Sequence, residues 1–172
     1  NLIYTEPATE DVHFVVNHIL DNYKYENIII VGFSLGGNLT LKYLGEYTEL
    51  LSPKIKGAIT ISAPIDLTSS EKEMDKLKNK LYIDEFLKTI RLKVLEKSYK
   101  FPDFDLDKDK LFKAKRFKHL EKLYTVPVFG FESPEDYWVK ASSKPYLSKI
   151  NKVTNLEVNP RMVFVLGYFG LR

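Results

Sequence analysis

Two short apolar segments, residues 27–33 and 57–62, constrain the fold more than any other feature of the sequence. Both are rich in β-branched residues and apolar on both faces, which is typical of strands buried inside a parallel sheet. A helical pattern over residues 10–23 precedes the first strand, and another over residues 36–46 separates the two strands. Helix, strand, helix and strand joined by short connections predict an α/β fold, with a parallel sheet, flanking helices and right-handed crossovers.

The first predicted helix begins with a favourable sequence. Thr9 is the predicted N-cap, and Glu10 and Asp11 follow it, where acidic residues suit the positive end of the helix dipole. A single apolar stripe then predicts that one side of this helix packs on the sheet. The stripe consists of Val12, Val15, Val16, Ile19, Leu20 and Tyr23.

From about residue 68 the sequence becomes rich in Lys and Glu and contains no strand-like segment for many residues. Residues 71–97 and 108–124 have apolar residues at helical spacing, and Ser133-Pro134 is typical of the capped start of a further short helix. Because no strand separates these helices, we interpret residues 68–146 as a helical lid inserted into one domain.

The whole sequence is therefore expected to form one domain. Residues 1–172 are interpreted as a single incomplete α/β domain that contains the lid, and the apolar run Val163–Leu166 is predicted to form a further strand.

Charge and composition exclude several classes of protein. The formal net charge is only +3, which is too mild to indicate nucleic-acid binding. The excess lies in residues 71–125, which carry 16 Lys or Arg against 11 Asp or Glu, and we interpret it as a solvated helix surface. Apolar runs fall short of the roughly 20 residues that span a bilayer, so no transmembrane segment is expected. The absence of Cys fits a reducing compartment, and we expect a cytoplasmic protein.

The sharpest motif is the run Gly32-Phe-Ser-Leu-Gly-Gly37, a G-x-S-x-G pattern. A strand is predicted to end at Phe33 and a helix to begin after Leu35, which is the strand–turn–helix setting of a nucleophile elbow. Ser34 must then adopt a strained backbone conformation that points its hydroxyl out of the sheet. We expect Gly32 and Gly36 to remove side chains that would collide in so tight a turn.

The same turn would favour developing negative charge. The backbone N–H of Leu35 is the natural first oxyanion donor, because it lies at the N-terminus of the following helix. The alternative interpretations are a Gly-rich turn without chemistry and a phosphate-binding loop. A phosphate loop would favour Lys after the glycines, whereas this sequence has Asn38.

These residues resemble the α/β-hydrolase superfamily, and more narrowly its YheT-like branch, which is related to the medium-chain fatty acid ethyl ester synthase/esterases and to membrane-anchored phospholipases. The elbow is specific to the superfamily, and the other matching segments narrow the resemblance to the branch. They are Thr9–Asp11, Gly32–Leu39, Leu41–Glu46, Ser62–Leu67, Thr125–Pro127, Gly130–Phe131, Glu135–Tyr137 and Ala141–Ser143.

The resemblance implies a serine hydrolase of the carboxylesterase class. Ser34 would attack the carbonyl of a small-molecule or lipid-like ester, and the Leu35 N–H would stabilise the oxyanion. No cofactor and no metal ion are implied. Two other functions stay open: an acyltransferase that shares the elbow, and a non-catalytic binding or membrane-surface module that uses the basic lid.

The sequence departs from the family at the other catalytic positions. The family's acid lies in a run such as Asp-Asp-Pro after the lid, whereas Asn151–Thr154 follows Ile150 and no Asp occurs beyond Asp136. The family's Gly-Gly-His loop has no counterpart, and the sequence begins after the loop that supplies the second oxyanion donor. We therefore expect a fragment that is inactive on its own.

The residues present offer few replacements. His13, His18 and His119 are expected at the surface or edge of helices, although a lid histidine such as His119 could swing toward Ser34. Asp66 follows the second predicted strand, where some α/β-hydrolases place the acid, but a turn cap is the simpler interpretation.

Overall fold

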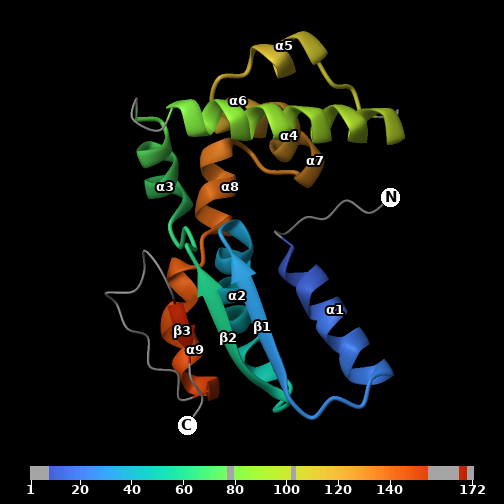
Figure 1. Ribbon diagram of the computed structural model, residues 1–172, viewed down its shortest axis with the longest axis vertical. Coiled ribbons are helices and arrows are strands. Elements are labelled where there is room, and N and C mark those ends of the chain that lie inside the picture. The colour runs from blue at the N-terminus through green and yellow to red at the C-terminus, as the bar shows by residue number, and fades with distance from the viewer. Residues whose placement is uncertain (1–7, 77–79, 102–103, 155–166, 170–172) are drawn as a thin grey trace. The chain divides into compact units, whose positions relative to one another are not determined.

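The computed structural model of the protein describes residues 8–76, 80–101, 104–154 and 167–169 (Figure 1). These residues form two compact units. Among the described residues, the helical unit comprises residues 67–76, 80–101 and 104–140, and the sheet unit comprises residues 8–66, 141–154 and 167–169. The expected lid, residues 68–146, overlaps the helical unit as far as Lys140, whereas its last six residues belong to the sheet unit.

The sheet unit contains a parallel pair of strands, as predicted. Strand β1 (Ile28–Phe33) pairs with β2 (Ile55–Ile61), with Val31 opposite Ile59 and Phe33 opposite Ile61. Helix α2 (Leu35–Glu46) connects them, followed by a 3₁₀ turn over Thr48–Leu50.

The expectation of an entirely parallel sheet is wrong. A third strand, β3 (Gly167–Phe169), pairs antiparallel with β2, so the strand order is β1-β2-β3 and the sheet is mixed. A short strand that adds to a free edge can pair in either direction, because the edge offers N–H and C=O groups to both. The predicted strand Val163–Leu166 lies outside the described residues.

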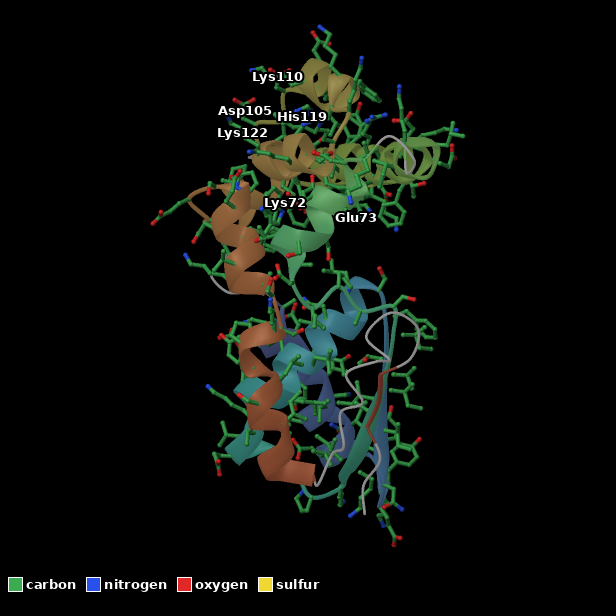
Figure 2. The ribbon with its side chains drawn as sticks, turned by 90° about the vertical axis from the view of Figure 1, so that its left-hand side faces the viewer. Lys72, Glu73, Asp105, Lys110, His119 and Lys122 are labelled. Carbon is green, nitrogen blue, oxygen red and sulfur yellow. The ribbon has the colours of Figure 1, made fainter. Side chains whose placement is uncertain are left out.

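Three helices pack on one face of this sheet. Residues of helices α1 (Thr9–Asn22), α2 and α9 (Leu147–Thr154) form one core with residues of the strands (Figures 1 and 2). The predicted stripe of the first helix is only partly buried, because Val15 and Tyr23 are 53% and 51% exposed. A second 3₁₀ turn, Lys144–Tyr146, leads into α9. The buried core of the sheet unit consists of Val16, Leu41, Tyr43, Leu44, Ile55, Ala58 and Ile150.

The other face of β1 is open in the described part of the chain. Ile29, Val31 and Phe33 are 60%, 52% and 64% exposed. The prediction of a strand buried on both faces is therefore wrong for β1, because α1, α2 and α9 all cover the same side. An open apolar strand face of this kind is an aggregation hazard.

The start of α1 also differs from the prediction. Thr9 is the first helical residue and is 1% exposed, so it belongs to the interior and does not cap the helix. The capping position is occupied by Ala8, whose φ is 39° and whose carbonyl accepts the Val12 N–H at 3.2 Å. Packing thus outweighs the N-cap preference of threonine.

The helical unit contains α3 (Leu67–Met74), α4 (Lys80–Lys100), α5 (Lys108–Lys113), α6 (Phe117–Leu120), a π-helical turn (Glu121–Thr125), α7 (Val126–Phe129) and α8 (Pro134–Ala141). Its core consists of Ile83, Leu87, Val94, Leu111, Ala114 and Leu120.

The prediction of a single helix over residues 108–124 is wrong, because the backbone is extended between α5 and α6. Ala114 has a ψ of 119°, and the Arg91 guanidinium donates to its carbonyl oxygen. This hydrogen bond from α4 satisfies a carbonyl that a continuous helix would have used. The predicted cap of α8 is confirmed, since the Ser133 hydroxyl accepts the Asp136 N–H at 3.1 Å.

Two carboxylates with raised pKa values lie inside the helical unit. Glu71 of α3 is 5% exposed, and Glu121 accepts a 2.7 Å hydrogen bond from the Trp138 indole N–H. Burial, opposed by that hydrogen bond and reinforced by the negative charges of Glu71 and Glu135, raises the pKa of Glu121 to about 7. Burial likewise raises the pKa of Glu71. Above pH 4.5, these two carboxyl groups therefore stay protonated in the folded protein to a higher pH than in the unfolded chain.

The free energy of unfolding is expected to fall as the pH rises from 4.5 to about 7. An acid whose folded pKa is raised contributes full stability below its unfolded pKa of 4.5, and this contribution is lost as the pH passes the folded value of about 7. The loss for Glu121 is on the order of 3 kcal/mol. Urea unfolding of the wild type and of Glu121→Gln at pH 5 and pH 8 would measure it.

Glu121→Gln should unfold with a weaker pH dependence than the wild type and be the more stable protein at pH 8. Glu96→Gln is the matched control, because Glu96 is exposed in the same unit, its hydrogen bond to Lys100 lowers its pKa, and its charge does not contribute to the raised pKa of Glu121. Identical pH profiles for the wild type and Glu121→Gln would contradict the assignment.

Candidate active site

The chain turns sharply at Ser34, between the end of β1 and the start of α2. Ser34 has a φ of 50° and a ψ of −124°, a conformation that residues with a side chain rarely adopt. Its N–H donates to the Ile61 carbonyl at 2.8 Å, and its own carbonyl accepts the N–H groups of Gly37 and Asn38 at 2.9 and 3.2 Å. These hydrogen bonds to β2 and to the first turn of α2 hold the strained conformation in place.

The tightness of the turn explains two of its glycines. A Cβ on Gly32 would lie 2.5 Å from the Gly36 carbonyl oxygen and 2.7 Å from the Gly37 Cα. A Cβ on Gly37 would lie 2.9 Å from the Cβ of Ala63, so Gly37 brings α2 close to the end of β2. The expectation for Gly36 is wrong, because a Cβ there would meet nothing within 4 Å.

The two residues predicted to take part in chemistry are accessible. Ser34 is exposed, and the side chain of Leu35 is 50% exposed. Leu35 is the first residue of α2, where backbone N–H groups have no acceptor within the helix. The arrangement therefore places a hydroxyl beside the positive end of a helix dipole, which suits attack on a carbonyl and stabilisation of the resulting oxyanion.

A buried asparagine in the first turn of α2 binds the backbone of residues 141 and 143. This role was not predicted from the sequence. Asn38 is 2% exposed, donates to the Ala141 carbonyl at 2.8 Å and accepts the Ser143 N–H at 2.8 Å. Both partners are more than 100 residues away in sequence. The one sequence signal was the presence of Asn in an apolar helix, where its propensity is poor.

A second strained serine ends the neighbouring strand. Ser62 follows β2, is exposed and has a φ of 53°. Sequence analysis did not single it out, although the following Ala63-Pro64 dipeptide favours a turn. Because β1 and β2 are parallel, Ser34 and Ser62 both lie at the carboxyl end of the sheet.

His13 does not serve Ser34. Its ring stacks on Tyr47 at 4.3 Å between centroids, and its Nδ1 lies 3.4 Å from the Tyr43 hydroxyl. Tyr47 caps the C-terminus of the 12-residue α2 and Ser34 its N-terminus, so about 18 Å of helix separates them. Burial, with the nearby Tyr47, raises the pKa of Tyr43 to about 12, so the hydroxyl beside His13 stays protonated.

The other two histidines agree with the prediction of surface positions. His18 is exposed on α1, where the Asn22 amide contacts its Nδ1 at 3.2 Å. His119 is exposed on α6. Figure 2 shows it in the helical unit, together with Lys110 of α5 and Lys122 of the π-helical turn.

Asp66 forms an ion pair with Lys144 at 3.0 Å. In addition, the Lys144 N–H donates to the Ile65 carbonyl at 3.0 Å. Asp66 therefore joins the end of β2 to the segment before α9, and this contact favours the structural interpretation over a role as the triad acid.

The described residues bear on two further possibilities, a metal site and a membrane span. No group of three or more His, Asp or Glu side chains there is arranged to hold a metal ion. Within the same ranges, no helix combines the length and apolarity needed to cross a bilayer.

Comparison with known proteins identifies the family. The sequence profile described as alpha/beta hydrolase fold matches residues 4–157. Abhydrolase domain-containing protein 2 of Drosophila melanogaster is 44% identical over 59 residues, which are 34% of this chain and 15% of that protein. Human Monoacylglycerol lipase ABHD2 is 25% identical over 86% of this chain and 37% of its own length. Human Phospholipase ABHD3 is 28% identical over 83% of this chain and 34% of its own length.

The chain thus spans between 15% and 37% of the length of these relatives. No solved structure matches it. The profile match covers most of the sequence, including the strand–turn–helix at Ser34, and the chain therefore belongs to the alpha/beta hydrolase fold family.

Proposed function

We propose that this chain carries the nucleophile of a serine hydrolase that acts on carboxylic esters of lipid-like compounds. The observation that supports the proposal is the exposed Ser34, which is held at a positive φ between the end of β1 and the N-terminus of α2. In the reaction the Ser34 hydroxyl forms a bond to the ester carbonyl carbon and expels the alcohol, and water then releases the acid.

The relatives support the substrate class. Two of the human relatives are named as a monoacylglycerol lipase and a phospholipase, so the esters that they act on belong to lipids. We propose glycerolipid or other acyl esters of medium length for this protein, and we place it in the YheT-like branch on the segments that accompany the elbow.

The described residues provide candidates for two of the catalytic roles, the nucleophile and the first oxyanion donor. We propose Ser34 as nucleophile and the Leu35 N–H as the first oxyanion donor. His13 contacts the opposite end of α2, His18 contacts Asn22, and Asp66 pairs with Lys144. We therefore propose that the 172 residues supply the nucleophile without a complete triad, which would leave hydrolysis by this chain alone slow.

A serine-selective fluorophosphonate tests the assignment of the nucleophile. Because oxyanion stabilisation outlasts the loss of other triad members, Ser34 should react roughly tenfold faster than any other serine of the chain. Peptide mass spectrometry after timed labelling of the intact 172-residue protein would locate the adduct and give the rate at each serine.

Ser62→Ala is the matched control, since Ser62 is also exposed, also at a strand end and also at positive φ. Labelling should persist in Ser62→Ala and disappear in Ser34→Ala. A uniform slow labelling of many serines, unchanged in Ser34→Ala, would refute the proposal.

A further inference from the structure

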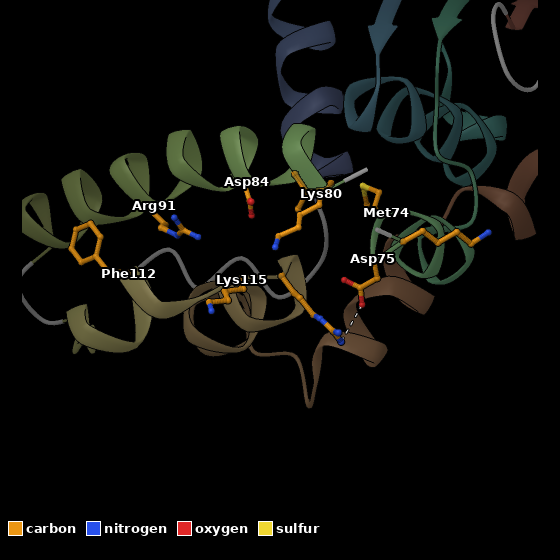
Figure 3. Close-up of a pocket in the computed structure, with 10 residues that line it drawn as sticks. Met74, Asp75, Lys80, Asp84, Arg91, Phe112 and Lys115 are labelled. Atoms are coloured by element: carbon orange, nitrogen blue, oxygen red, sulfur yellow. Dashed lines mark ion pairs between the residues drawn. The ribbon is translucent and has the colours of Figure 1, made fainter. Parts of the chain in front are cut away.

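The helical unit contains a cavity whose lining is both basic and apolar. It lies between α4 and the segment that joins α5 to α6, and its volume is about 510 Å³. Figure 3 shows Lys80, Asp84 and Arg91 of α4 on one side, with Phe112 and Lys115 opposite. All of these residues belong to the helical unit, so the cavity is formed within one compact body.

Cationic side chains outnumber acidic ones in the lining by three, with five Lys or Arg against two Asp. The Asp75 carboxylate is paired with Arg116 at 3.3 Å. Lys80, Arg91 and Lys115 have no carboxylate of the described residues within ion-pairing distance. The three positive charges and the negative charge of Asp84 give this part of the lining a net charge of about +2.

The Arg91 guanidinium is held with one donor unused. One of its terminal nitrogens donates to the Ala114 carbonyl, and its Nε is buried without a hydrogen-bond partner. A buried donor without an acceptor destabilises a protein by about 1 to 3 kcal/mol. The bond to Ala114 holds the guanidinium beside the cavity, where its remaining terminal N–H groups would form charge-assisted hydrogen bonds with a bound anion.

The apolar part of the lining suits a hydrocarbon. Ile83 is buried in the core of the unit, and Met74 packs against that core. Phe112 is 53% exposed, so a large apolar surface stands open beside the cations. An inorganic anion alone would leave this surface in water.

We propose that the cavity binds a phosphate monoester that carries a hydrocarbon chain, with the phosphate on Lys80, Arg91 and Lys115 and the chain against Phe112 and Ile83. A phosphate monoester has a charge of about −1.5 to −2 at pH 7, which matches the local excess of the cavity, whereas a carboxylate or a phosphodiester would leave one cation unbalanced. The inference goes beyond the proposed ester hydrolysis and uses none of its residues.

Calorimetric titration of the full 172-residue chain with n-octyl phosphate tests the site. Octyl phosphate should bind roughly tenfold more tightly than inorganic phosphate, which lacks the apolar contact, and roughly tenfold more tightly than octyl sulfate, which has a single charge. Equal affinity for octyl phosphate and octyl sulfate would overturn the choice of a phosphate monoester.

Single-residue variants locate the binding site. Lys80→Gln should weaken octyl phosphate binding roughly tenfold, and Arg91→Lys should weaken it although the charge is kept, because Lys lacks the fixed fork of donors. Lys122→Gln is the control, since Lys122 is an exposed lysine of the same unit outside the cavity lining (Figure 2). Circular dichroism of each variant would verify folding. Equal losses in Lys80→Gln and Lys122→Gln would overturn the site.

One further experiment distinguishes a membrane lipid from a soluble ligand, and one variant distinguishes this cavity from the proposed active site. Sedimentation with vesicles of phosphatidylcholine, with and without phosphatidic acid, tests a membrane headgroup. Binding that requires phosphatidic acid and Lys80 would identify a lipid headgroup, and binding of octyl phosphate alone would identify a soluble ligand. Ser34→Ala should bind octyl phosphate like the wild type, and loss of binding there would overturn the proposal while leaving the role of Ser34 to the labelling experiment.

Discussion

Replacement of Gly32 by alanine is expected to destabilise the protein by about 3 kcal/mol or more. The added Cβ would lie 2.5 Å from the Gly36 carbonyl oxygen, 2.6 Å from the Thr40 hydroxyl oxygen and 2.7 Å from the Gly37 Cα. Two of these three atoms belong to the backbone, which no side-chain rotation relieves. The start of α2 would have to move away from β1, and the free energy of unfolding in urea would measure the cost.

Gly36→Ala is the matched control in the same motif. A Cβ at Gly36 meets nothing within 4 Å, and Gly36 lies in the first turn of α2. Alanine there should be neutral or stabilising by up to about 1 kcal/mol, because glycine loses more backbone freedom on folding than alanine. Similar destabilisation by both substitutions would show that the turn is not packed as described.

The second large effect is expected at Asn38. Asn38→Ala removes both long-range hydrogen bonds of a side chain that is 2% exposed, and leaves the Ala141 carbonyl and the Ser143 N–H without their partner. Each unsatisfied buried group costs about 1 to 3 kcal/mol, so a loss of about 3 kcal/mol is expected. Thermal and urea unfolding, followed by far-UV circular dichroism, would give the difference.

Asn22→Ala provides the comparison for this substitution. Asn22 is exposed at the end of α1, and its amide donates to the carbonyl of His18 and contacts the His18 ring, one turn earlier. Loss of these local, solvent-exposed hydrogen bonds should change the unfolding free energy by less than about 0.5 kcal/mol. If Asn38→Ala were as mild as Asn22→Ala, the link between α2 and residues 141–143 would not contribute to stability.

The elements that sequence analysis predicted well share one property, which is that neighbouring residues specify them. The strand ending at Phe33 follows from a run of β-branched residues, and the turn at Ser34 from the glycines beside it. The cap at Ser133 follows from the Ser-Pro pair and the acidic residues behind it. In each case the evidence lies within about six residues of the chain.

Except for the expected collision at Gly36, which is local, the predictions that failed concern contacts with distant segments. The break at Ala114 is stabilised by Arg91, 23 residues earlier. Thr9 was expected to cap α1 and is instead buried. Helical spacing and capping preference describe an isolated segment, and they do not include the neighbours that the segment acquires on folding.

Local sequence specifies where the chain turns from strand to helix at Ser34, because glycine spacing and β-branching act on adjacent backbone atoms. Three features depend on the packing of distant segments. Asn38 bonds to residues 141 and 143, one face of β1 is open in the described part of the chain, and one cavity is lined by Lys80, Arg91 and Lys115. Burial, long-range hydrogen bonds and the clustering of charges depend on which segments pack together, and that information is absent from the spacing of residues along a single stretch of chain.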